Sequence, residues 1–325
     1  MKQSPEFSLI QQYFHALTAS REDVIVGIGD DCAVLNNPQD TYTAISIDTL
    51  VQGIHFFADV DPYRLGIKAL AVNLSDLAAM GAEPAWFTLA LTLPEINDDW
   101  LKQFSAGLAE IAQQHRVQLV GGDTTRGPLT ITIQVHGHLA KENILQRNAA
   151  QGADLICVTG CLGDAAAGLQ YRLGQLDSAL LTDTDIEYLL QRLEMPTPRN
   201  QIGQQLVGHA HAVIDVSDGL LADLNHILKA SNKGAKLDLS ALPFSTVLQK
   251  LPTELARQLA LTGGDDYELC FTATADNVAK LKQQFPDMIH VIGEITEDKG
   301  INYQNAQGEW QAFSEIKAGY DHFAR

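Results

Sequence analysis

Aspartates recur along this chain beside short apolar runs, most of them next to glycine or a small polar residue. The six segments are GIGDDCAV, AISIDTL, NLSDLA, LVGGDTTRG, AVIDVSDGL and LTGGDDYEL. Most of these runs are typical of a strand that ends in a turn, although NLSDLA has the spacing of a helix. A strand that ends in an aspartate places the carboxylate at a sheet rim, where ligand sites form in α/β folds. The chain must therefore fold so that strand ends present acids at such a rim.

Strand-like and helix-like segments alternate along both halves of the chain. In the first half, an amphipathic helix is predicted at Phe7–Ala19, strands at 24–29, 41–48, 85–93, 117–122 and 129–139, and helices at Pro62–Gly81 and Asn97–His115. In the second half, strands are predicted at 155–160, 212–217, 263–274 and 288–295, helices up to about His209, at Gly219–Ser231 and Ala275–Phe285, and then a weak hairpin. This alternation indicates an α/β or α+β fold. A turn-rich stretch at Arg147–Gly152 predicts two domains, residues 1–148 and 149–325.

Length and composition place the chain among globular proteins. Its 325 residues suffice for two domains, and the 46% apolar and 19% charged residues argue against disorder. The formal net charge of −18 argues against nucleic acid and anionic membranes as partners. No apolar run could span a bilayer and no signal-peptide core is present, so a cytoplasmic protein is predicted. The four scattered cysteines form no C-x-x-C pair, which argues against zinc and a disulfide framework.

One aspartate, Asp76, lies in a helix that is predicted to be buried. Apolar residues recur there at helical spacing, and Asp76 points away from their stripe, on a side that carries Leu65, Ala69 and Val72. An unpaired carboxylate in such a place would cost several kcal/mol, so Asp76 needs a partner. The partner is either a structural one, a basic side chain or backbone donors, or a metal ion.

The acidic segments as a group favour a hard cation. Few lysines or arginines lie beside them, and neighbouring carboxylates repel one another unless a cation binds. Mg²⁺ suits such a site, because it takes carboxylate, water and phosphate ligands. The chain has no G-x-x-x-x-G-K-[ST] loop, no protein-kinase motif set and no G-x-G-x-x-G fingerprint. A bound nucleotide would therefore be held mainly through Mg²⁺ and backbone amides.

Four other residues each allow a structural and a functional interpretation. Asp218 either caps a helix or binds metal, and Arg147 either forms a surface ion pair or contacts phosphate. His55 is either a hydrogen-bonded, partly buried histidine or a substrate contact. Tyr320, in the C-terminal GYDHF, either docks a tail for stability or closes over a ligand.

Seven segments, taken together and in order, resemble the thiamine-monophosphate kinase family, a branch of the aminoimidazole ribonucleotide synthetase-like superfamily of ATP-using enzymes. They are GIGDDCA, SIDTLVQGIHF, KALAVNLSDLAAMGAEP, GGDTTRG, IDVSDGL, GGDDYEL and GYDHF, and the similarity around them extends from about Phe7 to Phe323. The resemblance implies two α/β domains. The N-terminal domain would bind ATP and Mg²⁺ and pair its sheet with that of a second subunit in a homodimer, and the C-terminal domain would complete the active site. It also implies direct in-line transfer of the ATP γ-phosphoryl group to thiamine monophosphate, with several Mg²⁺ ions as cofactors.

The resemblance also assigns roles to individual residues. It implies metal ligation, and with it the catalytic role, by Asp31, Asp48, Asp76, Asp123, Asp215 and Asp218, helped by Ser46 and Ile47. It implies ATP contacts by Gly122, Asp123, Arg147 and Ser217. It implies contacts to thiamine monophosphate by His55, Asp265 and Tyr320.

Two residues depart from the pattern of the family. Ile47 stands where a small polar residue is expected, so it can bind metal only through its backbone, and Asp265 stands where glutamate is common. Two alternatives to the kinase reaction stay open. One is another ATP-using synthetase of the superfamily, and the other is a non-catalytic Mg²⁺–nucleotide-binding protein.

Overall fold

The computed structural model describes residues 5–142, 144–304 and 309–313. These residues form two compact units. The first unit runs to Leu77 and continues from Ala82 to Glu142, and the second comprises Ala78–Gly81 and the residues after Asn143. The two-domain α/β organisation predicted from the alternating segments is confirmed. Within the described ranges, no helix combines the length and the apolar character that crossing a membrane requires.

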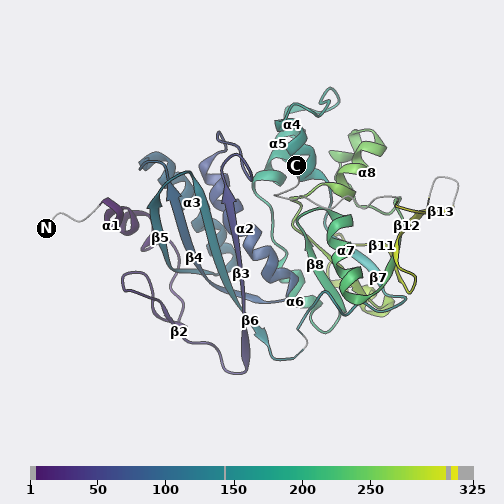
Figure 1. Ribbon diagram of the computed structural model, residues 1–325, viewed down its shortest axis with the longest axis horizontal. Coiled ribbons are helices and arrows are strands. Elements are labelled where there is room, and N and C mark those ends of the chain that lie inside the picture. Colours follow the sequence, from purple (N-terminus) through teal and green to yellow (C-terminus); the bar gives the residue numbers. More distant parts are fainter. Residues whose placement is uncertain (1–4, 143, 305–308, 314–325) are drawn as a thin grey trace. The chain divides into compact units, whose positions relative to one another are not determined.

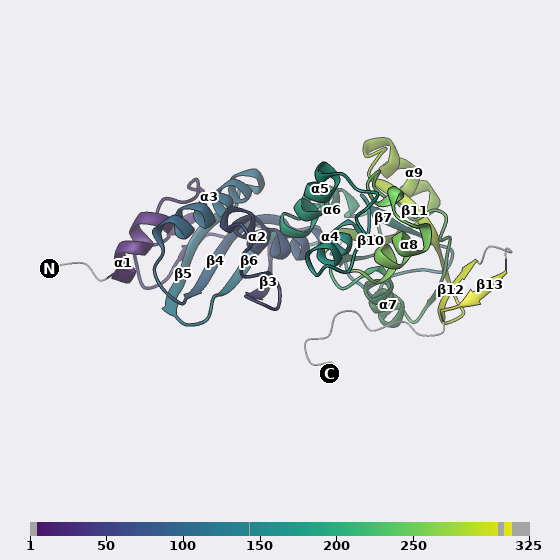
Figure 2. The same cartoon turned by 90° about the horizontal axis from the view of Figure 1, so that it is seen from above.

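The first unit is built on a four-stranded sheet with the order β3-β6-β4-β5 (Figure 1). Its elements are α1 (Pro5–Leu9), the π-helical turn η1 (Ile10–Phe14), β1 (Val24–Val26), β2 (Val34–Leu35), β3 (Thr41–Val51), α2 (Pro62–Ala79), β4 (Glu83–Leu93), α3 (Asp98–His115), β5 (Gln118–Arg126) and β6 (Thr130–Ala140). β6 pairs antiparallel with β3 and β4, whereas β5 runs parallel to β4. Figure 2 shows α2 and α3 together on one face of this sheet.

Two glycines set how closely α2 and α3 pack. A Cβ atom on Gly66 would lie 2.2 Å from the carbonyl oxygen of Phe104, and one on Gly107 would lie 1.9 Å from that of Tyr63. Only hydrogen fits at either position, so the two helix backbones touch directly. This contact fixes α2, which carries Asp76, relative to α3.

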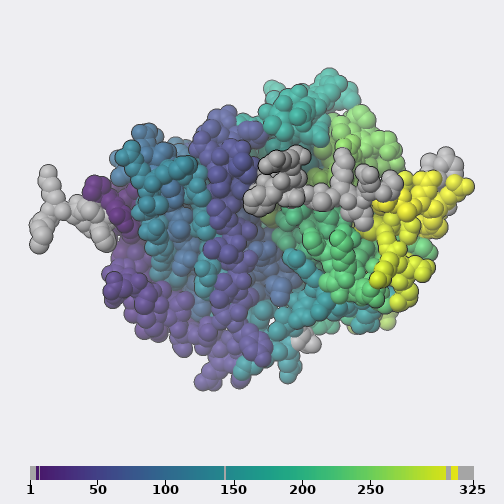
Figure 3. Space-filling view, viewed as in Figure 1, coloured from purple at the N-terminus to yellow at the C-terminus, as the bar shows by residue number. Residues whose placement is uncertain are grey.

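The opposite face of the same sheet is only partly covered. Trp86 packs there against Val24, Ala33 and Leu35, and only 1% of it is exposed. On the edge strand β3, in contrast, the side chains of Ile45 and Ile47 are 58% and 59% exposed. Figure 3 views the unit from this side, with β3 in violet. The edge strand thus presents an apolar surface to solvent.

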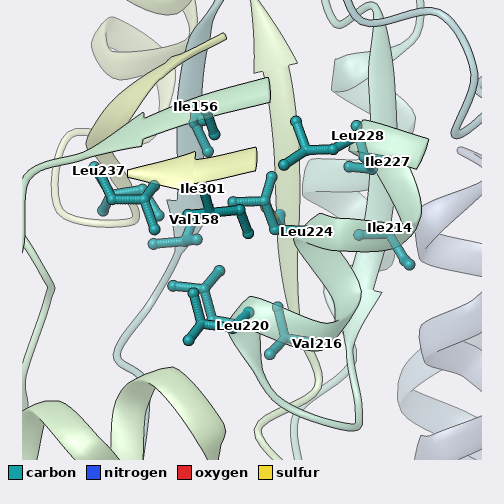
Figure 4. Packing of buried hydrophobic residues seen from close by; sticks show 14 of the residues in the cluster. Ile156, Val158, Ile214, Val216, Leu220, Leu224, Ile227, Leu228, Leu237 and Ile301 are labelled. Carbon is teal, nitrogen blue, oxygen red and sulfur yellow. The ribbon is translucent and has the colours of Figure 1, made fainter. Parts of the chain in front are cut away.

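The second unit contains a seven-stranded sheet with the order β13-β12-β9-β11-β7-β10-β8. Its elements are β7 (Leu155–Thr159), α4 (Asp164–Arg172), α5 (Asp183–Glu194), α6 (Asn200–Leu206), β8 (Ala212–Val216), α7 (Leu220–Ser231), β9 (Gly234–Leu237), the 3₁₀ turn η2 (Leu248–Lys250), α8 (Thr253–Thr262), β10 (Glu268–Ala273), α9 (Ala275–Gln284), β11 (Ile289–Thr296), β12 (Gly300–Gln304) and β13 (Trp310–Ala312). Its core includes strand residues such as Ile156 and Ile214 packed against Leu224 and Ile227 of α7 (Figure 4). This packing anchors α7 at the end of β8.

The predicted elements are largely confirmed, with instructive differences. The side chain of Asn97 accepts a hydrogen bond from the N–H of Trp100 at 3.0 Å, so α3 begins where the sequence predicted. The strand predicted at 263–274 begins only at Glu268, because the residues before it form a loop. The helix predicted at Phe7–Ala19 ends with η1, and β2, β9 and α8 were not predicted.

Candidate functional site

Strand β3 and helix α2 bring two of the predicted carboxylates together. Side chains alternate between the faces of a strand, so Ser46 and Asp48 share the face toward α2 while Ile47 points away. The Ser46 hydroxyl donates a hydrogen bond to Oδ2 of Asp76. The backbone N–H of Asp48 donates to Oδ1 of Asn73 at 3.0 Å. Asp76, which the sequence left with either a structural or a metal partner, therefore has a hydroxyl donor on the neighbouring strand.

The two carboxylates affect each other's charge. Burial, and to a lesser extent the nearby Asp76 carboxylate, together raise the pKa of Asp48 from its ordinary value of 3.8 to about 6. An arrangement in which two ionised carboxylates repel each other is unfavourable by itself and is relieved when a cation binds. The geometry therefore places negative charge at this point of the fold in advance of a ligand.

Asn73 supports this pair and was not predicted from the sequence. Its side chain is almost fully buried, and its Nδ2 donates to the carbonyl oxygen of Ala69 at 3.0 Å. The amide is thus held on α2 while its oxygen accepts from the strand, which ties Asp48 to the helix. Spacing could have indicated its role: in the segment NLSD, Asn73 precedes Asp76 by nearly one helical turn, so both lie on the same side of the helix.

Gly122 lies inside β5, as the sequence predicted. Asp123 also lies inside β5, although the sequence predicted that the strand ends at Gly122. The pairing of β5 with β4 skips Val120, and beyond this bulge Gly122 lies opposite Leu89 and Asp123 opposite Ala90. Leu89 is buried on the helix-covered face and Ala90 is exposed, so Asp123 points to the face turned away from α2. A Cβ atom on Gly122 would lie 1.9 Å from the carbonyl oxygen of Leu89, so close strand packing already requires this glycine.

His55 lies in the turn after β3 with a defined ring orientation. The backbone N–H of Val51 donates to its Nδ1 at 3.0 Å. Because Nδ1 accepts, the neutral ring carries its proton on Nε2. His55 is therefore set up as a hydrogen-bond donor through Nε2, which suits an anionic ligand.

In the second unit, the predicted residues Asp215, Ser217 and Asp218 lie where β8 turns into α7. Asp215 is the penultimate residue of β8 and is 4% exposed. Gly219, not Asp218, is the N-cap residue of α7, and it makes no side-chain cap. The helix-capping interpretation of Asp218 is therefore wrong. The amides of this turn are instead satisfied by Asp223, one turn into the helix.

The predicted substrate residue Asp265 lies in the loop that precedes β10. Its backbone is left-handed, with φ of 68°, and its N–H donates to the carbonyl oxygen of Ser217 at 2.9 Å. Tyr267, also left-handed, donates from its hydroxyl to Oδ1 of Asp265 at 3.2 Å. The loop is thereby tied to the β8–α7 turn, which places Asp265 next to a predicted metal-binding segment of the same unit.

A buried ion-pair cluster holds the base of this loop. Glu268 is fully buried and accepts from Arg192 at 3.1 Å, from Nε of Arg199 at 2.6 Å and from the Thr159 hydroxyl at 2.7 Å. Burial raises the pKa of the adjacent Asp266 well above its ordinary value. The sequence analysis missed this cluster, because α5, α6 and β10 meet only in the folded unit.

The remaining predicted residues are less constrained. Asp31 is exposed and follows Asp30, whose Oδ1 accepts its N–H at 2.9 Å. The side chain of Arg147 is exposed, and its carbonyl oxygen accepts from Ser231 at 3.0 Å. Tyr320 lies outside the described residues.

The side chains of the first unit offer oxygen ligands of the kind that Mg²⁺ binds, but too few of them to complete its coordination. Asp48, Asp76 and Ser46 supply the oxygen ligands that Mg²⁺ prefers. Over the described ranges, no three His, Cys, Asp or Glu side chains are gathered closely enough to hold a metal by themselves. A cation bound at Asp48 and Asp76 would therefore take much of its coordination from water and phosphate oxygens, as Mg²⁺ commonly does.

Comparison with known proteins gives a consistent result over the whole chain. The AIR synthase related protein family matches with its N-terminal domain at residues 29–139 and its C-terminal domain at 153–304. A thiamine-monophosphate kinase from Salmonella typhimurium is 48% identical over 328 aligned positions, which cover 98% of each chain. The crystal structure of a thiamine-monophosphate kinase from Stenotrophomonas maltophilia K279a is 45% identical, covers 89% of this chain and 92% of its own, and superposes with a TM-score of 0.82. The structure of AaThiL complexed with AMPPCP and TMP is 29% identical, covers 91% and 92%, and has a TM-score of 0.77.

Proposed function

This chain belongs to the AIR synthase related family and, within it, to the thiamine-monophosphate kinases, and we propose on this basis that it uses Mg²⁺ to transfer the γ-phosphoryl group of ATP directly to thiamine monophosphate. The products are ADP and thiamine diphosphate. The complex of a relative with AMPPCP, an ATP analogue, and TMP supports both substrates. In-line attack by a phosphate oxygen of the acceptor on the γ-phosphorus forms one P–O bond as the bond to ADP breaks.

The pairing of Asp48 with Asp76 is the observation in the structure that carries the proposal. Folding holds two carboxylates close enough for Asp76 to raise the pKa of Asp48. This repulsion lowers the stability of the protein when no ligand is bound, and a hard cation bound between the carboxylates would relieve it. Phosphoryl transfer between two phosphorylated molecules needs positive charge between reactants that would otherwise repel each other.

We propose that the aspartates of both units hold the metal ions. The ligands would be Asp31, Ser46, the backbone of Ile47, Asp48, Asp76, Asp123, Asp215 and Asp218, with Gly122, Asp123, Arg147 and Ser217 in contact with ATP. Because Asp123 points to the other face of the sheet, it would serve a different ion from the one held by Asp48 and Asp76. When bound, Mg²⁺ would neutralise the phosphate charges and orient the reacting oxygens. In this assignment, residues 1–148 supply the ATP- and Mg²⁺-binding part and residues 149–325 complete the active site.

The protein needs no strong general base for this reaction. The attacking group is a phosphate oxygen, which is largely ionised near neutral pH. The contribution of the acceptor-side residues is therefore binding and orientation. His55 suits this role, because its Nε2–H can donate to the acceptor phosphate, and Asp265 and Tyr320 are assigned to the same substrate.

The oligomeric state and the cellular location are proposed from the same family membership. We propose a homodimer joined through the N-terminal sheet, which the exposed Ile45 and Ile47 on β3 support. We also propose that the protein works in the cytoplasm, where its phosphoryl donor is made.

A coupled assay of ADP release with Mg²⁺–ATP tests the proposal. Release is expected with thiamine monophosphate and not with unphosphorylated thiamine, and EDTA should abolish it until Mg²⁺ is restored. Release with neither acceptor would indicate another ATP-using synthetase of the superfamily, or a binding protein if nucleotide still bound. Activity that survives complete chelation would contradict the role of the metal.

A further inference from the structure

Asp223 makes an unusual set of contacts at the start of α7. Its Oδ2 accepts hydrogen bonds from three consecutive backbone amides, those of Ser217, Asp218 and Gly219, at 3.0, 3.0 and 3.1 Å. The side chain is only 3% exposed. One carboxylate oxygen thus fixes the whole β8–α7 turn from inside the protein.

Successive amides at a helix N-terminus normally form a site for an external anion. Their N–H groups converge on one point, and the helix dipole adds positive potential, so phosphate groups often bind there. In this protein the converging amides of the turn already bind a carboxylate of the same chain. Asp223 therefore occupies the place that a phosphate oxygen would otherwise take.

The turn also has little freedom to relax in another direction. Gly219 has φ of 116°, and a Cβ atom on it would lie 2.9 Å from the carbonyl carbon of Thr262. The carbonyl oxygen of Ser217 accepts the N–H of Asp265 at 2.9 Å. The backbone of the turn is held by Asp223 on one side and by the Asp265 loop on the other.

We propose that Asp223 is a positioning residue: by holding the amides of residues 217–219 it orients Asp215, Ser217 and Asp218 for the Mg²⁺–nucleotide, and it keeps phosphate away from these three amides. This inference rests on the proposed function for the identity of the ligand. It assigns to Asp223 no contact with substrate. Its consequence is that nucleotide phosphates must be neutralised by cations on the aspartates, not by the amides of residues 217–219.

The test compares Asp223→Ala and Asp223→Asn with matched substitutions at Asp154. Asp154 is 2% exposed and accepts a backbone N–H from Gln151 at 2.8 Å, so it is similarly buried but lies away from the turn. Initial rates are measured across Mg²⁺ concentrations. Loss of Asp223 is expected to lower kcat by about 10- to 100-fold and to raise the half-saturating Mg²⁺ concentration. The KM for thiamine monophosphate should change little, and the Asp154 variants should lower Tm while leaving the Mg²⁺ dependence unchanged.

Hydrogen exchange gives a second measurement that does not depend on turnover. Amides of residues 217–219 should exchange faster in Asp223→Ala than in the wild type, and inorganic phosphate should slow them again in the variant only. Asp223→Asn keeps one acceptor oxygen and should lie between the two, which also covers the case in which the alanine variant does not fold. Unchanged exchange, or unchanged kcat and Mg²⁺ dependence in an active protein, would overturn the inference. A wild type with no kinase activity would instead count against the proposed function, and the exchange result would still decide the role of Asp223.

Discussion

At the scale of single residues, the proposed metal binding needs an ionised carboxylate at Asp48, whereas folding without metal disfavours that ionised carboxylate. Asp48 lies in a partly buried position beside Asp76, where ionisation is disfavoured. A neutral side chain there would suit the metal-free fold better, but it would remove a ligand. Residues retained at such positions are a common mark of functional sites, because selection for stability alone would replace them.

The effect of pH on stability follows from the same residue. The pKa of Asp48 is about 6 in the folded protein against an ordinary 3.8. As pH rises through this window, the unfolded chain loses its proton first, so without metal the unfolding free energy falls and stays lower above it. Asp48→Asn should remove this slope and gain at most about 3 kcal/mol at pH 7, with no gain below about pH 4.

Urea denaturation in EDTA at several pH values would measure this effect, and the same variant should lose its kinase activity. Asp31→Asn is the control for the stability measurement alone, because Asp31 is exposed but is also a proposed metal ligand. A variant at residue 48 that is less stable than the wild type at pH 7 would show that the carboxylate is structural.

His55 permits a sharper test of substrate assignment. His55→Ala removes the Nε2 donor, and a hydrogen bond to a charged group contributes about 1.5 kcal/mol or more, so KM for thiamine monophosphate should rise about tenfold. KM for ATP should change much less. His226→Ala, at an exposed position on α7, is the control for steady-state kinetics. Equal changes in both KM values would argue against a specific contact with the acceptor.

At the scale of elements, periodic segments were predictable and their exact registers were not. The α2 and α3 helices and the strands β4, β6, β7 and β8 follow apolar patterns that are local in the sequence. The bulge at Val120 in β5 is different, because it depends on packing against β4 and the covering residues before β3. A single skipped residue moves every later side chain to the other face, and for this reason the sequence could not show where Asp123 points.

The site residues also divide into those that the local sequence identifies and those that only the folded structure reveals. Aspartates in short motifs could be identified from the sequence, because their roles are carried by residue type and neighbours. Asp223 looks like an ordinary acid in the first turn of a helix, and its three amide contacts exist only once the turn has formed. Glu268 likewise reads as part of a strand, although it binds Arg192 of α5 and Arg199, the residue just before α6.

Helix packing predicts a coupling between stability and activity. Gly107→Ala would place a methyl group against the carbonyl oxygen of Tyr63 and push α2 away from α3. The variant should lose about 1–3 kcal/mol of unfolding free energy and also lose kcat, since α2 carries Asn73 and Asp76. Chemical denaturation and initial rates would measure both. Gln103→Ala, on the exposed side of α3, should change neither, and a fully active Gly107→Ala would show that the helix spacing is not critical.

At the scale of the whole molecule, self-association has to overcome charge repulsion. Two copies that each carry a formal charge of −18 repel each other, so a stable homodimer needs a contact surface that is mainly apolar. The exposed Ile45 and Ile47 on the edge strand β3 offer such a surface. An uncovered edge strand is also prone to pair with other chains, and a defined partner removes that hazard.

The proposed dimer interface can be tested by placing a charge on it. Ile45→Lys would bury an unpaired ammonium group, which costs several kcal/mol, so the dimer dissociation constant should rise by more than about 100-fold. Sedimentation equilibrium at increasing salt would measure this, with salt favouring the wild-type dimer by screening repulsion. Ile96→Lys is the matched control, because Ile96 is 54% exposed but lies in the loop before α3. A dimer that tolerates the charge at residue 45 and not at residue 96 would place the interface on the helix side of the unit, and the exposed isoleucines of β3 would then need another partner.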